Sequence, residues 1–162
     1  MNTKKVGVIE VIAGMALVLA GKKKQGLLLF GHGFYGLEKA YRYNHPRLEP
    51  GLKARWAEAV RFYDETHQED TNRFLHRWGI PVILLGAVGL LTTRPYGTPW
   101  RIFASTFALG WLSNIIGHGK YEKNAPAFTE DPLSFIAGPV WDLKQLKSAA
   151  PVAPHEEPVR GK

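Results

Sequence analysis

Three histidines and one glutamate are the residues of this 162-residue chain whose types suit a metal site. His67 and His76 lie nine positions apart, and His118 is followed four residues later by Glu122. Residues four positions apart on a helix face the same way, so His118 and Glu122 can reach one ion. The chain has no cysteine, so imidazole and carboxylate groups would hold the metal, and these suit iron, manganese or zinc.

The two earlier histidines can meet only if the chain bends between them. Nine residues of one straight helix turn through about 900°, which places His67 and His76 on opposite sides. Residues 68–70 are polar and offer a break between two helices. On the second helix, Asn72 and His76 share one face, at positions i and i+4. We therefore expect a bend there that turns both imidazoles toward His118.

Three further polar residues extend the candidate site. Asn72 and Asn114 lie on otherwise apolar segments, and Tyr63 precedes His67 by one helical turn. We expect Tyr63 and Asn114 to support the metal ligands through hydrogen bonds. Each residue also has a plain structural interpretation. An interior histidine is more often a hydrogen-bonded core residue than a metal ligand, and Glu122 can pair with a neighbouring lysine.

Apolar segments with helical periodicity predict an all-α protein, a small bundle built from helical hairpins. Residues 6–43 form the first hairpin, around a basic turn. Gly7 and Gly14 lie seven residues apart, and small residues on one face let two helices approach closely. Another helix follows from about Leu52, with its apolar residues at three- and four-residue steps.

A second hairpin follows the predicted bend. Its apolar helices are residues 82–91 and 102–116, joined by a loop rich in turn-forming residues. We expect Pro81 to begin the first of these helices, since proline suits the first helical position. A last helical element, residues 133–146, is expected to break at Pro139.

The chain is therefore expected to have three parts. Residues 1–50 are the N-terminal apolar hairpin, and residues 51–146 are the helical domain with the metal site. Residues 147–162 are rich in alanine, proline and charge, and we predict a disordered tail there.

Charge and hydropathy favour a membrane over nucleic acid as the partner. The formal charge is +7, but the basic residues are not gathered in one run. Lysines at 4–5 and 22–24 bracket the first apolar segment, as basic residues flank membrane segments. We predict a protein integral to or tightly associated with a membrane, of the bacterial inner membrane or endoplasmic reticulum type. It would contact lipids, and a homo-oligomer is one possible assembly. The apolar segments are shorter than the ~20 residues of a full span, so a soluble bundle stays an alternative.

The order of the polar residues resembles that of a known family. The pattern reads Tyr63-x3-His67-x4-Asn72-x3-His76-x2-Gly79-x-Pro81, then two apolar helices, then Gly117-His118-x3-Glu122-x3-Pro126-Ala127 and Gly138-Pro139. Over about residues 59–146 it is similar to the fungal 2-hydroxy-fatty-acid dioxygenases and their bacterial relatives.

This resemblance implies a multi-helix membrane protein that uses divalent iron, Fe(2+), and molecular oxygen, O2. The family reaction shortens a 2-hydroxy fatty acid by one carbon, as a step of fatty-acid α-oxidation. The resemblance makes His67, His76 and His118 the iron ligands. It assigns Glu122 and Asn72 to the acidic and amide positions of the family motif, for which we expect catalytic roles.

Two features depart from the family pattern, and two other functions stay open. Residues 6–43 lie outside the resemblance, and residues 68–70 are acidic where the family often has small or polar residues. One alternative function is a non-catalytic lipid-binding or scaffold bundle, in which the histidines hydrogen-bond to one another. The other is a zinc hydrolase, in which Glu122 would act as the base on a bound water.

Overall fold

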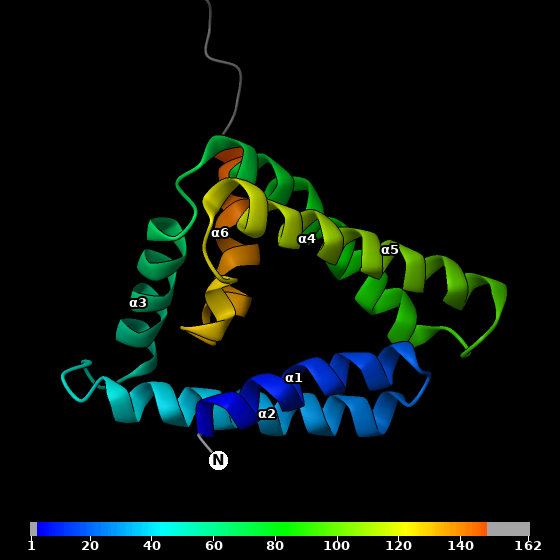
Figure 1. Ribbon diagram of the computed structural model, residues 1–162, viewed down its shortest axis with the longest axis horizontal. Helices are drawn as coiled ribbons and strands as arrows, with labels where there is room; N and C mark the ends of the chain where they lie inside the picture. The colour runs from blue at the N-terminus through cyan, green and yellow to red at the C-terminus, as the bar shows by residue number, and fades with distance from the viewer. Residues whose placement is uncertain (1–2, 149–162) are drawn as a thin grey trace, which may run out of the picture.

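Six α-helices make up most of the structure, a computed structural model that describes residues 3–148 (Figure 1). Their bounds are α1 Thr3–Leu19, α2 Lys23–Asn44, α3 Leu52–Glu65, α4 Asp70–Thr92, α5 Thr98–Ile116 and α6 Ser134–Ser148. A π-helical turn, η1 Gly117–Glu122, follows α5, and a 3-10 turn, η2 Ala127–Thr129, precedes α6. No strand occurs within residues 3–148, which confirms the all-α prediction. The predicted disordered tail lies outside the described residues from position 149 onward.

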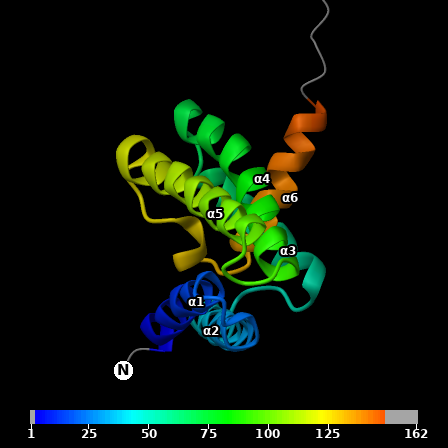
Figure 2. The ribbon, with the colours of Figure 1, turned by 90° about the vertical axis from the view of Figure 1, so that its right-hand side faces the viewer.

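α1 and α2 form the predicted N-terminal hairpin, and glycines bring their backbones into contact. A Cβ atom at Gly14 would lie 2.6 Å from the backbone nitrogen of Phe30 and 2.7 Å from the carbonyl oxygen of Gly26. A Cβ atom at Gly33 would lie 2.8 Å from the carbonyl oxygen of Gly7. Figure 2 shows the two helices side by side, nearly end on. Only glycine fits these crossings, so the small-residue pattern sets how closely the two helices pack.

α4 and α5 form the second hairpin through contacts of the same kind. A Cβ atom at Gly86 would lie 2.5 Å from the backbone nitrogen of Phe107, and one at Gly110 would lie 2.8 Å from that of Ile83. The expectation that Pro81 begins a helix is wrong, because α4 runs through it without a break. Proline cannot donate a backbone hydrogen bond, but the close packing against α5 beside Pro81 keeps α4 continuous.

α6 also contains an interior proline. The expected break at Pro139 is wrong, since α6 continues past it. Gly138, the residue before it, lies against the ring of Tyr63 on α3, where a Cβ atom would clash. This packing of α6 on α3 holds the helix in place although one backbone hydrogen bond is missing.

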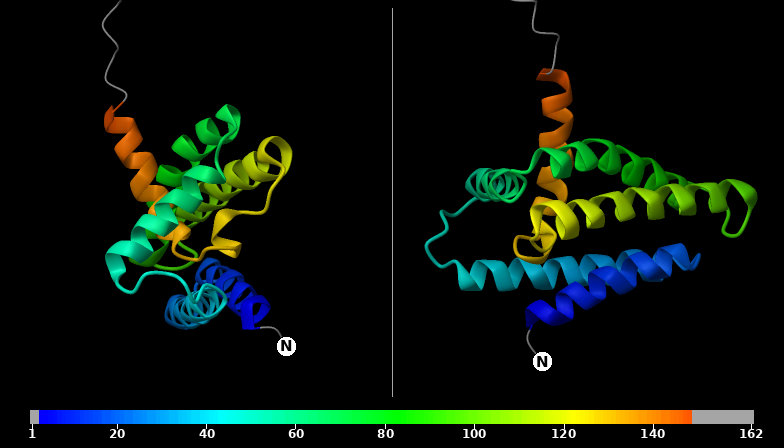
Figure 3. Two further views of the ribbon diagram at one scale, coloured as in Figure 1. Left: turned by 90° about the vertical axis from the view of Figure 1, so that its left-hand side faces the viewer. Right: turned by 45° about the horizontal axis from the view of Figure 1, so that its top comes forward.

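The two hairpins meet at their turns and diverge toward the opposite end, where α3 and α6 lie between them (Figures 1 and 3). The hydroxyl of Tyr96 donates a 2.6 Å hydrogen bond to the carbonyl oxygen of Ala20. Lys23 Nζ donates to the carbonyl oxygen of Leu91 at 3.0 Å. A buried apolar cluster fills this end: Leu90, Trp100 and Phe107, with Met15, Val18 and Leu19 of α1 packed against them.

At the diverging end, a buried arginine ties the N-terminal hairpin to the rest of the chain. Arg55 of α3 is fully buried and pairs with Asp131 before α6 and, at 2.8 Å, with Glu38 of α2. Its guanidinium carbon also lies 4.2 Å from the ring centroid of Tyr41. A buried charge is tolerated only with such partners, so this ion-pair network fixes α2 and α3 relative to the start of α6.

α4 is the one helix within residues 3–148 that is long and apolar enough, by length and composition, to cross a membrane. Its 23 residues correspond to about 34 Å of helix, close to the thickness of a bilayer core. The face of α4 that points away from the body exposes large apolar side chains: Trp78, Leu84, Leu85 and Val88. α5 exposes a similar set beside it: Ile102, Leu109, Leu112 and Ile115.

Candidate metal centre

The structure brings the three predicted histidines together, although three different segments carry them. His67 lies in the break between α3 and α4, His76 on the second turn of α4, and His118 in η1. The ring centroid of His67 lies 4.6 Å from that of His76 and 4.8 Å from that of His118. The centroids of His76 and His118 are 4.8 Å apart. The break between α3 and α4 is the bend that the polar residues 68–70 predict, and all three rings are buried.

Backbone carbonyls fix the orientation of the first two imidazoles. His67 Nδ1 lies 2.7 Å from the carbonyl oxygen of Tyr63, and His76 Nδ1 lies 3.0 Å from that of Asn72. A carbonyl oxygen can only accept, so each Nδ1 carries a hydrogen, and in the neutral ring Nε2 then keeps its lone pair. This is the tautomer in which Nε2 can bind a metal.

The third imidazole is oriented by an asparagine that the sequence analysis did not identify. His118 Nδ1 lies 2.7 Å from Oδ1 of Asn124, whose Nδ2 donates to the carbonyl oxygen of Thr66 at 3.0 Å. The second bond orients the amide so that its oxygen faces His118. Lys123 has a left-handed φ of 57°, which turns the chain at the end of η1 and brings Asn124 beside the ring. A loop residue of this kind has no periodic signal in the sequence.

The chemical properties of this cluster suit a divalent metal ion. Each histidine offers one ligand nitrogen, and these atoms all lie within 4.8 Å of one another. His67 Nε2 is buried without a hydrogen-bond partner among the described residues, an arrangement that costs free energy unless something binds there. Burial lowers the pKa of His67 to about 2 and also lowers the pKa of His118. Both rings are therefore neutral near pH 7, the form that a metal requires.

Glu122 and Asn72 lie beside the three imidazoles and hold the break between α3 and α4. The Glu122 carboxylate accepts hydrogen bonds from the backbone N–H groups of Gln68 at 2.9 Å and Glu69 at 3.1 Å. It also accepts one from Asn72 Nδ2 at 3.0 Å. Burial acts to raise the pKa of Glu122, but these three hydrogen bonds hold it below its usual value. In this structure the two residues position the segment that carries His67.

Tyr63 packs directly on the first imidazole. Its ring stacks on His67 with the centroids 3.8 Å apart, and its hydroxyl donates a 2.7 Å hydrogen bond to Asp142 of α6. Burial raises the pKa of Asp142 to about 6, while the hydrogen bond from Tyr63 and the charges of Arg77 and Arg73 act to lower it. Tyr63 therefore links the position of His67 to α6 as well as to α3.

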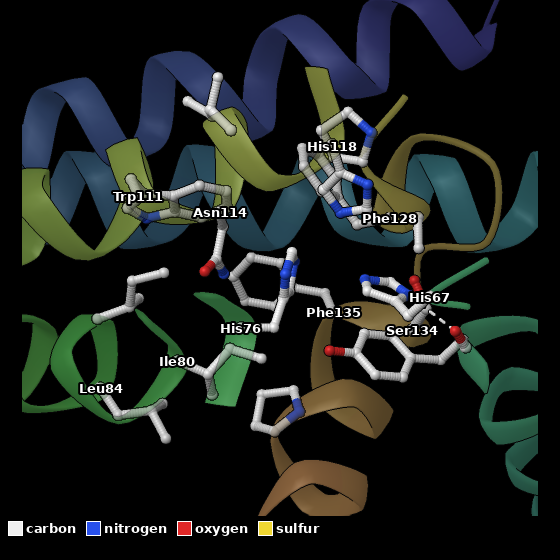
Figure 4. Close-up of a pocket in the computed structure, with 16 residues that line it drawn as sticks. His67, His76, Ile80, Leu84, Trp111, Asn114, His118, Phe128, Ser134 and Phe135 are labelled. Carbon is white, nitrogen blue, oxygen red and sulfur yellow. Dashed lines mark hydrogen bonds between the residues drawn. The ribbon is translucent and has the colours of Figure 1, made fainter. Parts of the chain in front are cut away.

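A cavity of about 100 Å³ lies beside the three imidazoles (Figure 4). Its wall is mainly apolar and includes Ile80, Leu84, Trp111, Ile115, Phe128 and Phe135. Leu84 is 43% exposed and Ile115 is 53% exposed, so the wall reaches the outer apolar face of α4 and α5. Asn114 projects into this space from α5.

The N-terminal hairpin supports the wall from behind. Phe30 of α2 lies 5.5 Å from the ring centroid of Phe135, which lines the cavity. Phe135 in turn stacks on Trp111 at 6.1 Å. The hairpin that lies outside the resemblance therefore contacts the wall of the candidate site through an aromatic side chain.

Comparison with known protein families matches residues 54–149 to one family model. The family is described as 2-hydroxy-palmitic acid dioxygenase Mpo1-like. The match covers more than half of the chain and includes all three histidines. No curated protein and no solved structure matches the chain.

Proposed function

Because the chain belongs to the 2-hydroxy-palmitic acid dioxygenase Mpo1-like family, we propose that it is a divalent-iron dioxygenase that shortens 2-hydroxy fatty acids by one carbon. The observation that carries this proposal is the convergence of three buried imidazoles, whose ligand atoms all lie within 4.8 Å of one another. Their Nδ1 atoms are all held by oxygen acceptors, which leaves the three Nε2 atoms as ligands.

The residues of the chain would hold the metal and shape its surroundings. His67, His76 and His118 would bind iron through Nε2. Divalent iron held there would supply the activation of oxygen that cleavage of the C1–C2 bond requires. The hydrogen bonds to the three Nδ1 atoms keep the rings in place, and such bonds typically raise metal affinity. The apolar wall would exclude water from the reacting groups.

The shape of the cavity supports a substrate with a long apolar tail. Its volume of about 100 Å³ is well below the ~300 Å³ of an ordinary small-molecule site. It would enclose the oxygen-bearing head of a fatty acid and the first carbons of the chain. The tail would then pass Leu84 and Ile115 to the exposed apolar face of α4 and α5.

That exposed face also supports a location in a membrane. Trp78, Leu85 and Val88 of α4 are each more than half exposed, and large apolar surfaces of this kind are costly in water. We propose that α4 and α5 contact the acyl chains of a bilayer. A fatty acid could then reach the imidazoles directly from the lipid.

Oxygen uptake by iron-loaded protein tests the proposed function. The protein is extracted in detergent, loaded with Fe(II) under argon and then exposed to oxygen with 2-hydroxypalmitate. We expect one iron per chain, oxygen consumption, and a fatty acid one carbon shorter in mass spectrometry. His76→Ala should lose both the metal and the activity. His32→Ala, which changes a histidine whose side chain is 73% exposed, should retain both.

The other outcomes point to the alternative functions. Protein that binds no iron at micromolar concentrations would contradict the dioxygenase proposal and favour a lipid-binding bundle. Protein that retains zinc, consumes no oxygen with iron and hydrolyses an acyl ester would favour the hydrolase.

A further inference from the structure

Two described polar groups that line the cavity, other than the imidazoles, lack a partner: the indole Nε1 of Trp111 and the amide oxygen of Asn114. Of the two, only the amide oxygen can accept a hydrogen bond. The Tyr63 hydroxyl donates to Asp142, and the Ser134 hydroxyl donates to the carbonyl oxygen of Asp131 at 2.6 Å. Asn114 is 8% exposed, and its Oδ1 is buried without a hydrogen-bond partner within residues 3–148. A buried amide oxygen without a partner costs free energy, so its retention in an apolar wall calls for a reason.

The fold makes room for this amide next to the histidines. Figure 4 shows the Asn114 side chain pointing from α5 into the cavity on the side of His76. Gly79 of α4 lies against Oδ1, and a Cβ atom at position 79 would clash with it. Asn114 also precedes His118 by four residues, which places both side chains on the same side of the chain. The amide therefore lies where a molecule bound in the cavity beside the three imidazoles would place its polar end.

The chemistry of the wall indicates which ligand group the amide would meet. None of the described residues that line the cavity is a lysine or an arginine, so the positive charge needed by a carboxylate would come from the metal. An amide both donates and accepts hydrogen bonds, and so does a hydroxyl group. A ligand without that hydroxyl would leave the amide unpaired, and sites built in this way discriminate strongly.

We propose that Asn114 is a specificity-determining residue that binds the 2-hydroxyl group and thereby selects 2-hydroxy fatty acids over plain fatty acids. This inference rests on the proposed function, because it assumes that a fatty acid enters the cavity head first. It assigns Asn114 to the substrate rather than to the support of the metal ligands.

Equilibrium binding under argon tests this assignment without turnover. Full-length protein loaded with Fe(II) in detergent is titrated with 2-hydroxydecanoate and with decanoate by calorimetry. The wild-type protein should prefer the hydroxy acid. In Asn114→Leu and the smaller Asn114→Ala, affinity for the hydroxy acid should fall about three- to tenfold, the effect of one lost hydrogen bond. Affinity for decanoate should change less than about twofold, and the iron content should stay at the wild-type value.

The control is Ser113→Ala, which changes the preceding polar residue of α5, whose hydroxyl donates to the carbonyl oxygen of Leu75. This variant should retain the wild-type preference. If the asparagine variants keep the same preference as the wild type, or lose both acids equally, the inference is wrong while the dioxygenase proposal stands. Equal affinity of the wild type for the two acids overturns it as well. Wild-type protein that binds iron but neither acid contradicts both the inference and the proposed substrate class.

Discussion

Each imidazole of the cluster has a close oxygen partner, within 3.0 Å of Nδ1, that fixes its orientation. For His67 and His76, that atom is a backbone carbonyl oxygen, which no side-chain substitution removes. For His118 it is the amide oxygen of Asn124. The His118 imidazole is therefore the one whose orientation a single side-chain substitution can release.

Asn124→Ala should weaken metal binding without removing a ligand. His118 would lose the acceptor that keeps Nε2 free for the metal, and the loss of such a bond typically costs 10- to 100-fold in affinity. Anaerobic competition with a chelating dye measures this change. Asn44→Ala, at an exposed asparagine at the end of α2, is the matched control and should bind metal normally. Unchanged affinity in Asn124→Ala would show that His118 does not need this bond.

The buried histidines should make the metal-free protein sensitive to acid. The pKa of His67 is about 2 in the folded state and about 6.5 in the unfolded chain. The unfolded chain therefore binds the proton first, and stability that is fully present above pH 6.5 is lost as the pH falls. The loss for this one group is roughly 1.4 kcal/mol per pH unit below 6.5, or about 2 kcal/mol at pH 5.

Thermal unfolding of chelator-treated protein at pH 7.5 and pH 5 checks this linkage. The wild-type Tm should fall further between the two conditions than the Tm of His67→Phe, which keeps a ring against Tyr63 but cannot bind a proton. Asp142, whose raised pKa acts in the opposite direction, is present in both proteins and largely cancels in the comparison. Equal shifts in the two proteins would mean that His67 does not resist protonation.

At the scale of the elements, the arginine network decides how the N-terminal hairpin is attached. Arg55 is fully buried, and its partners come from two other segments, Glu38 on α2 and Asp131 before α6. The hairpin lies outside the family match, yet its Phe30 backs the cavity wall and its Glu38 completes this network. The position of the N-terminal hairpin relative to the candidate site therefore depends on the buried charge of Arg55, which water does not solvate.

Asp131→Asn should destabilise the protein by about 3 kcal/mol, because it leaves the buried guanidinium with a single carboxylate. The midpoint of thermal or chemical unfolding in detergent measures the loss. Glu130→Gln is the control next in sequence. It removes an exposed ion pair with Lys4, which should be worth less than about 1 kcal/mol. A similar effect of the two substitutions would show that the Arg55 network does not support the fold.

The sequence predicted the elements best where the local pattern agrees with the packing. The polar residues 68–70 predict the bend, and Gly7 and Gly14 predict the close hairpin, since both effects act between neighbours in the chain or along one helix face. Pro81 and Pro139 misled the prediction, because packing against other helices outweighs the local preference of proline to end a helix.

At the site, the sequence predicted the histidines but not all of their partners. The polar break at residues 68–70 predicts that His67 and His76 can turn toward His118, and the structure places the three close together. It did not indicate Asn124 or Asp142, because both reach the site only through the tertiary fold. The sequence also did not predict the hydrogen bonds that Glu122 accepts at the start of α4, because they depend on how η1 packs there.

On the scale of the whole molecule, the outer face of the second hairpin is the feature most open to test. Val88→Arg places a charge on this face of α4, where Val88 is 60% exposed. If the face lies in a bilayer, the substitution should cost about 2.5–3.5 kcal/mol of insertion free energy. Carbonate extraction of cell membranes should then release more of this variant than of the wild type.

Ala57→Arg provides the comparison, because it adds the same charge at an exposed position of α3. This variant should stay in the membrane fraction to the same extent as the wild type. If Val88→Arg behaves in the same way, or if the wild-type protein is soluble after carbonate treatment, the outer face is not buried in lipid.

X-ray absorption spectroscopy of Fe(II)-loaded protein prepared under argon tests whether three imidazoles hold one iron. We expect one iron per chain, with three imidazole nitrogens bound to it at about 2.1 Å. His118→Ala should lose one of these nitrogens or all of the metal. Iron bound by oxygen atoms alone, or a wild-type spectrum that His118→Ala reproduces at full iron content, would contradict this expectation.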